Sequence, residues 1–194
     1  QTRSLVVDHN DKAVALYVQG VSDTLEAKAK MVLLRQVLES SFYSQLRTEQ
    51  QLGYIVFLTG MPFKEVPGSV FVVQSPSASV TAIQQAMQTF IAESIHAIPD
   101  DLSSYQQSAA TKLLQKSQSL SDESGVYWQN ILKDDETFSY RQRLVSAIHQ
   151  VTKEQLHEYY QQTLLDPQSL LWFTAERDTT ESYPVFGASS YQYP

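Results

Sequence analysis

Two side chains that can hydrogen-bond a negatively charged oxygen lie on either side of one glycine. Residues 46–57 have the sequence LRTEQQLGYIVF, in which a polar helix end passes through Gly53 into an apolar strand. Arg47 and Tyr54 lie near this junction, so rigid structure can hold a guanidinium and a phenol near each other. Both groups donate to a peptide carbonyl or to a developing oxyanion. On residue types alone, an exposed surface arginine followed by a core tyrosine is the simpler alternative.

The histidines do not form a recognisable metal-binding motif. After His157 the sequence HEYYQ places Gln161 where the zinc motif H-E-x-x-H needs its second histidine. The inverted form, H-x-x-E-H, is absent, as are a G-x-S-x-G elbow, a P-loop and a G-x-G-x-x-G fingerprint. His149 and His157 are most simply a solvent-exposed pair. We therefore expect no metal site and no bound cofactor in this chain, and no hydrolysis by the chain alone.

Paired acidic residues have structural explanations. Asp100 and Asp101 precede a helical pattern, where carboxylates interact favourably with the helix dipole. The acidic run 134–136 is expected to be a solvated helix end.

Composition limits the function classes. The chain of 194 residues carries a net charge of -7 and has no basic run able to neutralise phosphates, which argues against nucleic-acid binding. No apolar stretch reaches the roughly 18–20 residues that cross a bilayer. The absence of cysteine excludes disulfides and thiolate zinc sites but does not indicate a compartment. The chain starts at Gln1 without an initiator methionine or a signal peptide, as expected of a mature product or of a piece of a longer polypeptide.

The periodicity of apolar residues predicts an α+β domain over residues 1–177 and an irregular tail over 178–194. Strands are expected at 13–20, 54–59, 69–74 and 169–174, with 5–7 as a possible short edge partner and a hairpin joining the middle two. Helices are expected from an N-cap at Ser22 to about residue 40, at 42–51, from residue 80 to near Pro99, from the acidic pair 100–101 to 113, and at 123–132, 140–150 and 152–163. Thr152 and Gln155 form a capping-box sequence. The predicted architecture is one antiparallel-rich sheet with helices packed on one face.

The segment around Arg47 and Tyr54 closely resembles the signature of the last domain of insulinase/pitrilysin-type zinc peptidases. The similarity continues in order through residues 71–75 (FVVQS), 120–124 (LSDES), 127–128 (YW) and 156–160 (LHEYY), and covers roughly residues 8–176. The resemblance implies an insulinase-like metallopeptidase-homology domain.

By this resemblance, the parent enzyme has four related α+β domains around a closed chamber, and Zn²⁺ belongs to its N-terminal domain. This chain would then be the C-terminal non-zinc domain of a zinc metalloendopeptidase. Arg47 and Tyr54 would bind the substrate backbone and stabilise the transition state, with Gly53 letting the backbone turn to aim the tyrosine. The expected partners are the other domains of the parent and peptide substrates, with no nucleic acid and no membrane span.

Two alternatives come from other functional classes. The chain could be a non-catalytic structural domain of the same superfamily, or a free-standing peptide-binding module. The resemblance covers both periplasmic and cytosolic enzymes, and a closer likeness to pitrilysin weakly favours a bacterial periplasm.

Overall fold

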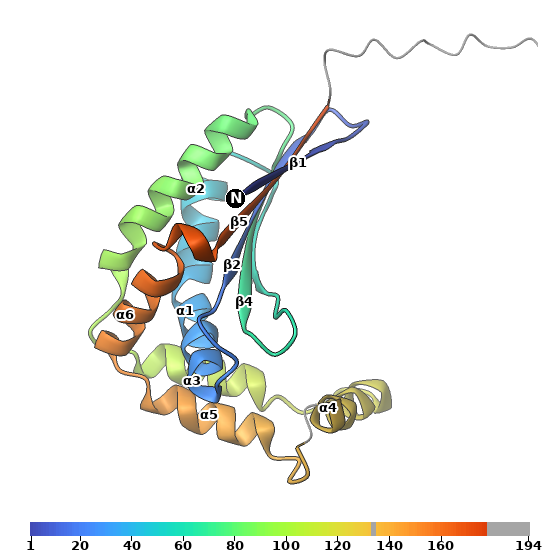
Figure 1. The fold of residues 1–194 in the computed structure, drawn as a ribbon, viewed down its shortest axis with the longest axis vertical. Coiled ribbons are helices and arrows are strands. Elements are labelled where there is room, and N and C mark those ends of the chain that lie inside the picture. The colour runs from blue at the N-terminus through green and yellow to red at the C-terminus, as the bar shows by residue number, and fades with distance from the viewer. Residues whose placement is uncertain (133–134, 178–194) are drawn as a thin grey trace, which may run out of the picture.

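A five-stranded sheet with helices against one face is the frame of this computed structural model, which describes residues 1–132 and 135–177 (Figure 1). The strands lie in the order β1-β5-β2-β4-β3. Their bounds are β1 Thr2–Val6, β2 Lys12–Gln19, β3 Ile55–Gly60, β4 Gly68–Ser75 and β5 Leu170–Glu176. The tail predicted over 178–194 lies outside the described residues, so the proposed division into domain and tail stays a prediction.

Three of the four strand pairs are antiparallel, which confirms the antiparallel-rich α+β prediction. β2 pairs with β4 and with β5, and β3 pairs with β4 as the predicted hairpin. The remaining pair, β1 with β5, is parallel and makes the sheet mixed. The first strand is at the edge as expected, but it begins at Thr2 and lies beside β5, because β5 occupies the free edge of β2.

The helices follow the predicted order with shifts at their ends. They are α1 Leu25–Tyr43, α2 Val80–Ser94, α3 Ser103–Leu113, α4 Leu120–Leu132, α5 Tyr140–Gln150 and α6 Lys153–Thr163. Short 3₁₀ turns occupy Ile95–Ala97 and Pro167–Ser169. The capping box of α6 is confirmed, since Gln155 N–H donates to the Thr152 hydroxyl while Thr152 N–H donates to the Gln155 side chain.

The first helix differs from the prediction at both ends. Its N-cap is Thr24 and not Ser22, because the Thr24 hydroxyl accepts the Ala27 N–H at 3.2 Å. Ser22 instead forms a hydrogen bond with the Thr24 hydroxyl. At the other end, the helix does not break before the predicted segment 42–51. It continues directly into a π-helix over Ser44–Glu49.

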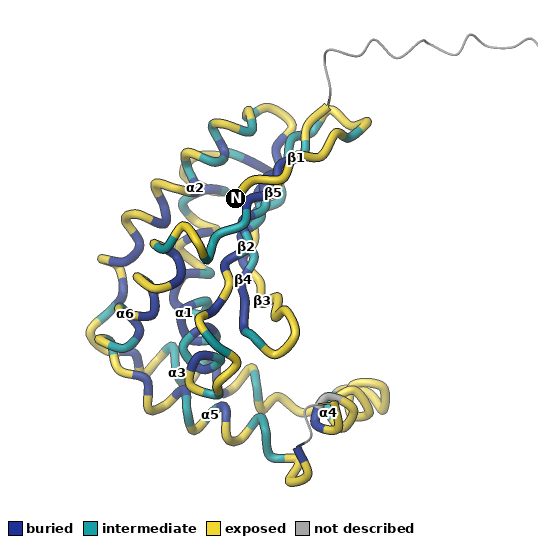
Figure 2. The backbone as a smooth tube through the Cα atoms, in the orientation of Figure 1, coloured by how far each residue is buried: buried dark blue, intermediate teal, exposed yellow. Residues whose placement is uncertain are grey.

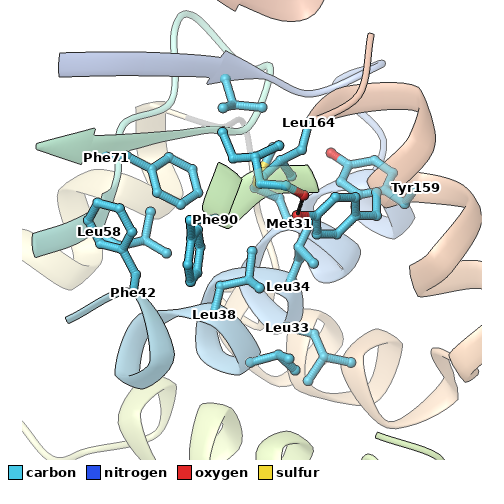
Figure 3. Packing of buried hydrophobic residues seen from close by; sticks show 14 of the residues in the cluster. Met31, Leu33, Leu34, Leu38, Phe42, Leu58, Phe71, Phe90, Tyr159 and Leu164 are labelled. Atoms are coloured by element: carbon cyan, nitrogen blue, oxygen red, sulfur yellow. Dashed lines mark hydrogen bonds between the residues drawn. The ribbon is translucent and has the colours of Figure 1, made fainter. Parts of the chain in front are cut away.

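The core lies between the helices and one face of the sheet, where alternate strand residues are buried (Figure 2). At its centre the ring of Phe42 meets Phe71 and Phe90 edge-on, with ring centroids 5.1 and 5.2 Å away (Figure 3). Helix α6 is tied to the same core by Tyr160, whose buried hydroxyl donates to the Ile91 carbonyl at 2.6 Å. One continuous core therefore joins β2, the helices and β5.

Candidate functional site

Arg47 lies in the π-helix that extends α1. The wider turn is closed by the Gln50 N–H, which donates to the Gln45 carbonyl five residues earlier. π-Turns of this kind are rare and are often found at functional sites. From this turn, Nη1 of the partly buried Arg47 donates to the Gly53 carbonyl at 2.8 Å. The guanidinium is thus anchored directly over the junction with β3.

The turn into β3 depends on two residues in different ways. Gln51 has the left-handed backbone angle, with φ of 51°, whereas Gly53 has no positive φ. The expectation that Gly53 itself supplies the turn is therefore wrong. A residue with a side chain does not fit at Gly53, because its Cβ would lie 2.2 Å from the Gln74 carbonyl oxygen of β4. This close approach lets the next N–H, that of Tyr54, donate to the same carbonyl at 3.1 Å.

Tyr54 lies at the surface in a small polar cluster. Its side chain is 45% exposed, so the alternative of a core tyrosine is wrong. The hydroxyl donates to Asp11 Oδ2 at 2.5 Å, and the Gln74 amide donates to the Tyr54 oxygen at 2.7 Å and to Asp11 Oδ2 at 3.1 Å. Arg47 is thus bonded to the Gly53 carbonyl, one residue before Tyr54, whereas the Tyr54 hydroxyl is bonded to Asp11 and Gln74. The roles of Arg47 and Tyr54 toward a substrate stay predictions.

Hydrogen bonding sets the charge states within this cluster. The hydrogen bond from Tyr54 is the main reason that the pKa of Asp11 is lowered. The hydrogen bond from the Gln74 amide lowers it further. The bond from Tyr54 to Asp11 is also the main reason that the pKa of Tyr54 is raised. At neutral pH the pair is therefore a carboxylate and a neutral phenol. Since a phenol has one proton, Tyr54 must leave Asp11 before it can donate to another acceptor, whereas Arg47 retains further N–H donors.

Sequence reasoning did not identify Asp11 or Gln74 as part of the site. Asp11 immediately precedes β2, and Gln74 lies in β4, so both reach Tyr54 only through sheet pairing. Asp11 also has a short-range neighbour, because its N–H donates to His9 Nδ1 at 3.1 Å. No local spacing in the sequence connects these residues to Tyr54.

Clusters of side chains that could bind a metal ion are absent from the described part of the chain. Within residues 1–132 and 135–177, no group of three or more His, Cys, Asp or Glu side chains is placed to hold a metal ion. His149 and His157 belong to the separate helices α5 and α6. Within the same ranges, no helix is long and apolar enough to cross a membrane.

The acidic pairs have different environments. Asp101 accepts the Ser103 N–H at the start of α3, as the predicted helix start requires. Asp135, however, was expected to be solvated and is only 7% exposed. It accepts hydrogen bonds from Thr137 and Arg143 at 2.7 and 3.0 Å, so a local polar network holds it in place. Asp134, its neighbour in the acidic run, lies outside the described residues.

Comparison with known proteins finds similarity to domains of several large proteins, two of which are named as proteases or peptide-degrading enzymes. A model described as PQQ synthase PqqF-like, C-terminal lobe domain 4, matches residues 33–128. Protease 3 of Escherichia coli strain K12 is 30% identical over 160 residues, which are 80% of this chain and 17% of that protein. The human insulin-degrading enzyme is 26% identical over 159 residues, covering 80% of this chain and 16% of that enzyme.

The fold has a close match among solved structures. The crystal structure of pitrilysin superimposes with a TM-score of 0.81 at 24% identity, covering all of this chain and 21% of the pitrilysin chain. The present chain therefore spans about one sixth of the length of Protease 3 and of insulin-degrading enzyme.

Proposed function

We propose that this chain serves as the C-terminal, non-zinc domain of a zinc metalloendopeptidase of the insulinase/pitrilysin type, a role supported by its similarity to a PqqF-like C-terminal lobe domain, to Protease 3 and to insulin-degrading enzyme. In this role it forms part of the wall of the substrate chamber. The described residues do not offer a zinc ligand set, so we assign the metal to the N-terminal domain of the parent. This chain contributes substrate binding and not the metal.

One observation carries the assignment of the site. The Arg47 guanidinium is held at the residue before Tyr54, and among the residues that the structure describes it is fixed by one hydrogen bond, to the Gly53 carbonyl. The remaining N–H groups of Arg47 can donate to a substrate carbonyl and to the oxyanion that forms from it. Tyr54 adds a second donor once its hydroxyl leaves Asp11. Contacts to the peptide backbone ignore side chains, which suits a peptidase of broad specificity.

The test is made in the parent enzyme with Arg47→Ala and Tyr54→Phe. Removing one donor to an oxyanion typically lowers the rate by about 10²–10³, so we expect a fall of that order in kcat/KM for each variant. Arg3→Ala and Tyr43→Phe are matched controls, because both residues are exposed and lie outside the cluster. Near wild-type kcat/KM in both site variants, with the fold intact by circular dichroism, would refute the assigned roles.

A second candidate is a non-catalytic structural or peptide-binding domain of the same superfamily. The bond from Tyr54 to Asp11 favours it, since the phenol proton is already engaged within the chain. The two candidates differ in the parent polypeptide. An H-x-x-E-H motif upstream in the same reading frame supports the peptidase, and its absence supports the non-catalytic domain.

The partners follow from the same proposal. Because the chain spans about one sixth of its relatives, we propose that its main partners are other domains of one polypeptide, together with peptide substrates. A bacterial periplasm remains the preferred compartment, supported by the bacterial source of Protease 3. Fractionation of source cells with an antibody against this chain tests that preference.

A further inference from the structure

A cavity of about 410 Å³ lies away from the Arg47 and Tyr54 cluster, between α1, the loop joining β3 to β4, and the facing ends of α4 and α5. Its volume is in the range of pockets that bind small ligands. Gly60, at the far end of β3, lines it. At about 3.3 Å per strand residue, Gly60 lies roughly 20 Å from Tyr54 along the chain. The cavity is therefore separate from the candidate site.

The charged groups that line the cavity are mostly positive. Lys28, Arg35 and Lys64 contribute three cations, and Glu65 contributes one carboxylate, which leaves an excess of two positive charges. This excess occurs in a chain whose net charge is -7. Glu65 is already engaged, because it accepts Lys28 Nζ at 2.8 Å. The cavity therefore favours an anion, and Glu65 does not neutralise Arg35.

Arg35 is the cation of this cavity that is best placed to bind an anion. Its side chain is partly buried, and burial is the main cause that lowers its pKa. No hydrogen bond or ion pair to the Arg35 guanidinium occurs among the residues that the structure describes; Glu39 acts on it only as a more distant charge. The guanidinium lies against Gly60, where an added Cβ would come 2.0 Å from Nη1. A partly buried charge with unused donors is costly unless an anion pairs with it.

The other walls of the cavity define the rest of the ligand. Met31, Val32 and Leu144 provide apolar surface, and Pro62 and Pro67 frame the loop side. One unpaired planar guanidinium matches the two oxygens of a carboxylate. Apolar walls suit a branched hydrocarbon better than a highly charged phosphate. We propose that this cavity binds a carboxylate carried by a branched apolar group, such as the C-terminal leucine of a peptide, with Arg35 as the anchoring donor.

The proposal is tested on the full 194-residue chain by NMR titration with four probes. N-acetyl-leucine carries the carboxylate and the branched side chain on a peptide-like body, and N-acetyl-leucinamide differs only in lacking the charge. We expect the acid to bind at least tenfold more tightly than the amide. Free 3-methylbutanoate carries a carboxylate and a branched group without the peptide-like body. Weaker binding than that of N-acetyl-leucine indicates a peptide C-terminus as the ligand, and equal binding indicates a simple organic acid. Inorganic phosphate, if it binds as tightly as N-acetyl-leucine, overturns the assignment of a carboxylate.

Two variants test the anchor independently. Arg35→Gln removes the charge and is expected to weaken N-acetyl-leucine binding at least tenfold. Gly60→Ala keeps the charge but displaces the guanidinium, so it should also weaken binding, and it preserves the test if Arg35→Gln does not fold. Arg3→Gln, on β1 and outside the cavity, is the control and should bind as the unmodified chain does. Unchanged affinity in a folded Arg35 or Gly60 variant, or equal affinity for acid and amide, would overturn the proposal.

Discussion

The hydroxyl of Tyr54 donates to a carboxylate oxygen of Asp11 at 2.5 Å, although 43 residues separate the two in the chain. Gln74 completes the cluster from β4 by donating to both side chains. The carboxylate of Asp11 therefore holds the phenol of Tyr54 in a fixed orientation. It also occupies the phenol proton, which is then not free to bind another acceptor. Under the proposed function, Asp11 is a positioning residue, because it acts on a substrate only through Tyr54.

Replacing Asp11 with asparagine should lower the pKa of Tyr54. The hydrogen bond to Asp11 and its negative charge both raise that pKa, and the isosteric amide removes the charge while keeping the size. The measurement is the ultraviolet titration of tyrosinate, taken as the difference between a chain with Tyr54 and the same chain with Tyr54→Phe. Asp8→Asn is the control, since Asp8 is an exposed carboxylate near the same end of β2. An unchanged titration of Tyr54 in the Asp11 variant would show that the two groups are not coupled in solution.

Gly53→Ala should destabilise the chain although it adds only a methyl group. The new Cβ would lie 2.2 Å from the Gln74 carbonyl oxygen, so β3 and β4 must separate. Overpacking of this kind typically costs about 1–3 kcal/mol, measured here as the loss in the free energy of unfolding in urea.

Gly125→Ala is the matched control for that substitution. Gly125 lies inside α4, and no atom comes within 4 Å of a Cβ placed there. Alanine should raise the free energy of unfolding by about 0.5–1 kcal/mol through helix propensity. Equal effects at the two glycines would contradict the importance of the close approach at Gly53.

Local patterns were sufficient to predict most helices and strands of this fold. The helix Tyr140–Gln150 and the capping box at Thr152 could be predicted because their signals lie within a few adjacent residues. The prediction of Ser22 as the N-cap is wrong, because a second hydroxyl, that of Thr24, precedes the same helical run and accepts the Ala27 N–H. The π-turn at Ser44–Glu49 has the composition of an ordinary helix, so the sequence alone predicts helix over 42–51 but not the wider turn.

The candidate site could be predicted only in part for a related reason. Arg47 and Tyr54 flank one junction, so their spacing in the sequence is informative. Asp11 and Gln74 reach Tyr54 through strand pairing, and no local pattern specifies which residues of distant strands become neighbours. Asp135 was beyond reach for a different reason: its hydrogen bonds to Thr137 and Arg143 are local, but the acidic composition of the run 134–136 does not indicate that they form.

Thr152→Ala should lower the free energy of unfolding by about 1 kcal/mol, the typical cost of losing an N-cap hydroxyl. The substitution removes the acceptor of the Gln155 N–H at the start of α6. Urea unfolding at neutral pH measures the change. Thr111→Ala is the control, because the Thr111 hydroxyl donates to the Gln107 carbonyl inside α3 and is not at the start of that helix. A loss at Thr111 as large as that at Thr152 would argue against a specific capping effect.

Asp135 should make the stability of the chain depend on acid pH. Hydrogen bonds from Thr137 and then Arg143, together with the charge of Arg143, lower the pKa of Asp135 from 3.8 to about 2 in the folded chain. A group whose pKa is lower in the folded state stabilises that state above its unfolded pKa. This stabilisation should be complete above about pH 5 and should be lost as the pH falls from about 4 to about 2.

Asp135→Asn isolates that contribution. The amide does not titrate, so the difference in the free energy of unfolding between the original chain and the variant should be constant from pH 7 to 5 and should shrink toward pH 2. Urea unfolding at pH 7, 5, 4, 3 and 2 measures it, with Asp23→Asn as an exposed control. A difference that stays the same down to pH 2 would mean that the Thr137 and Arg143 bonds do not favour the ionised carboxylate. In that case the network around Asp135 contributes to stability through packing and neutral hydrogen bonds alone.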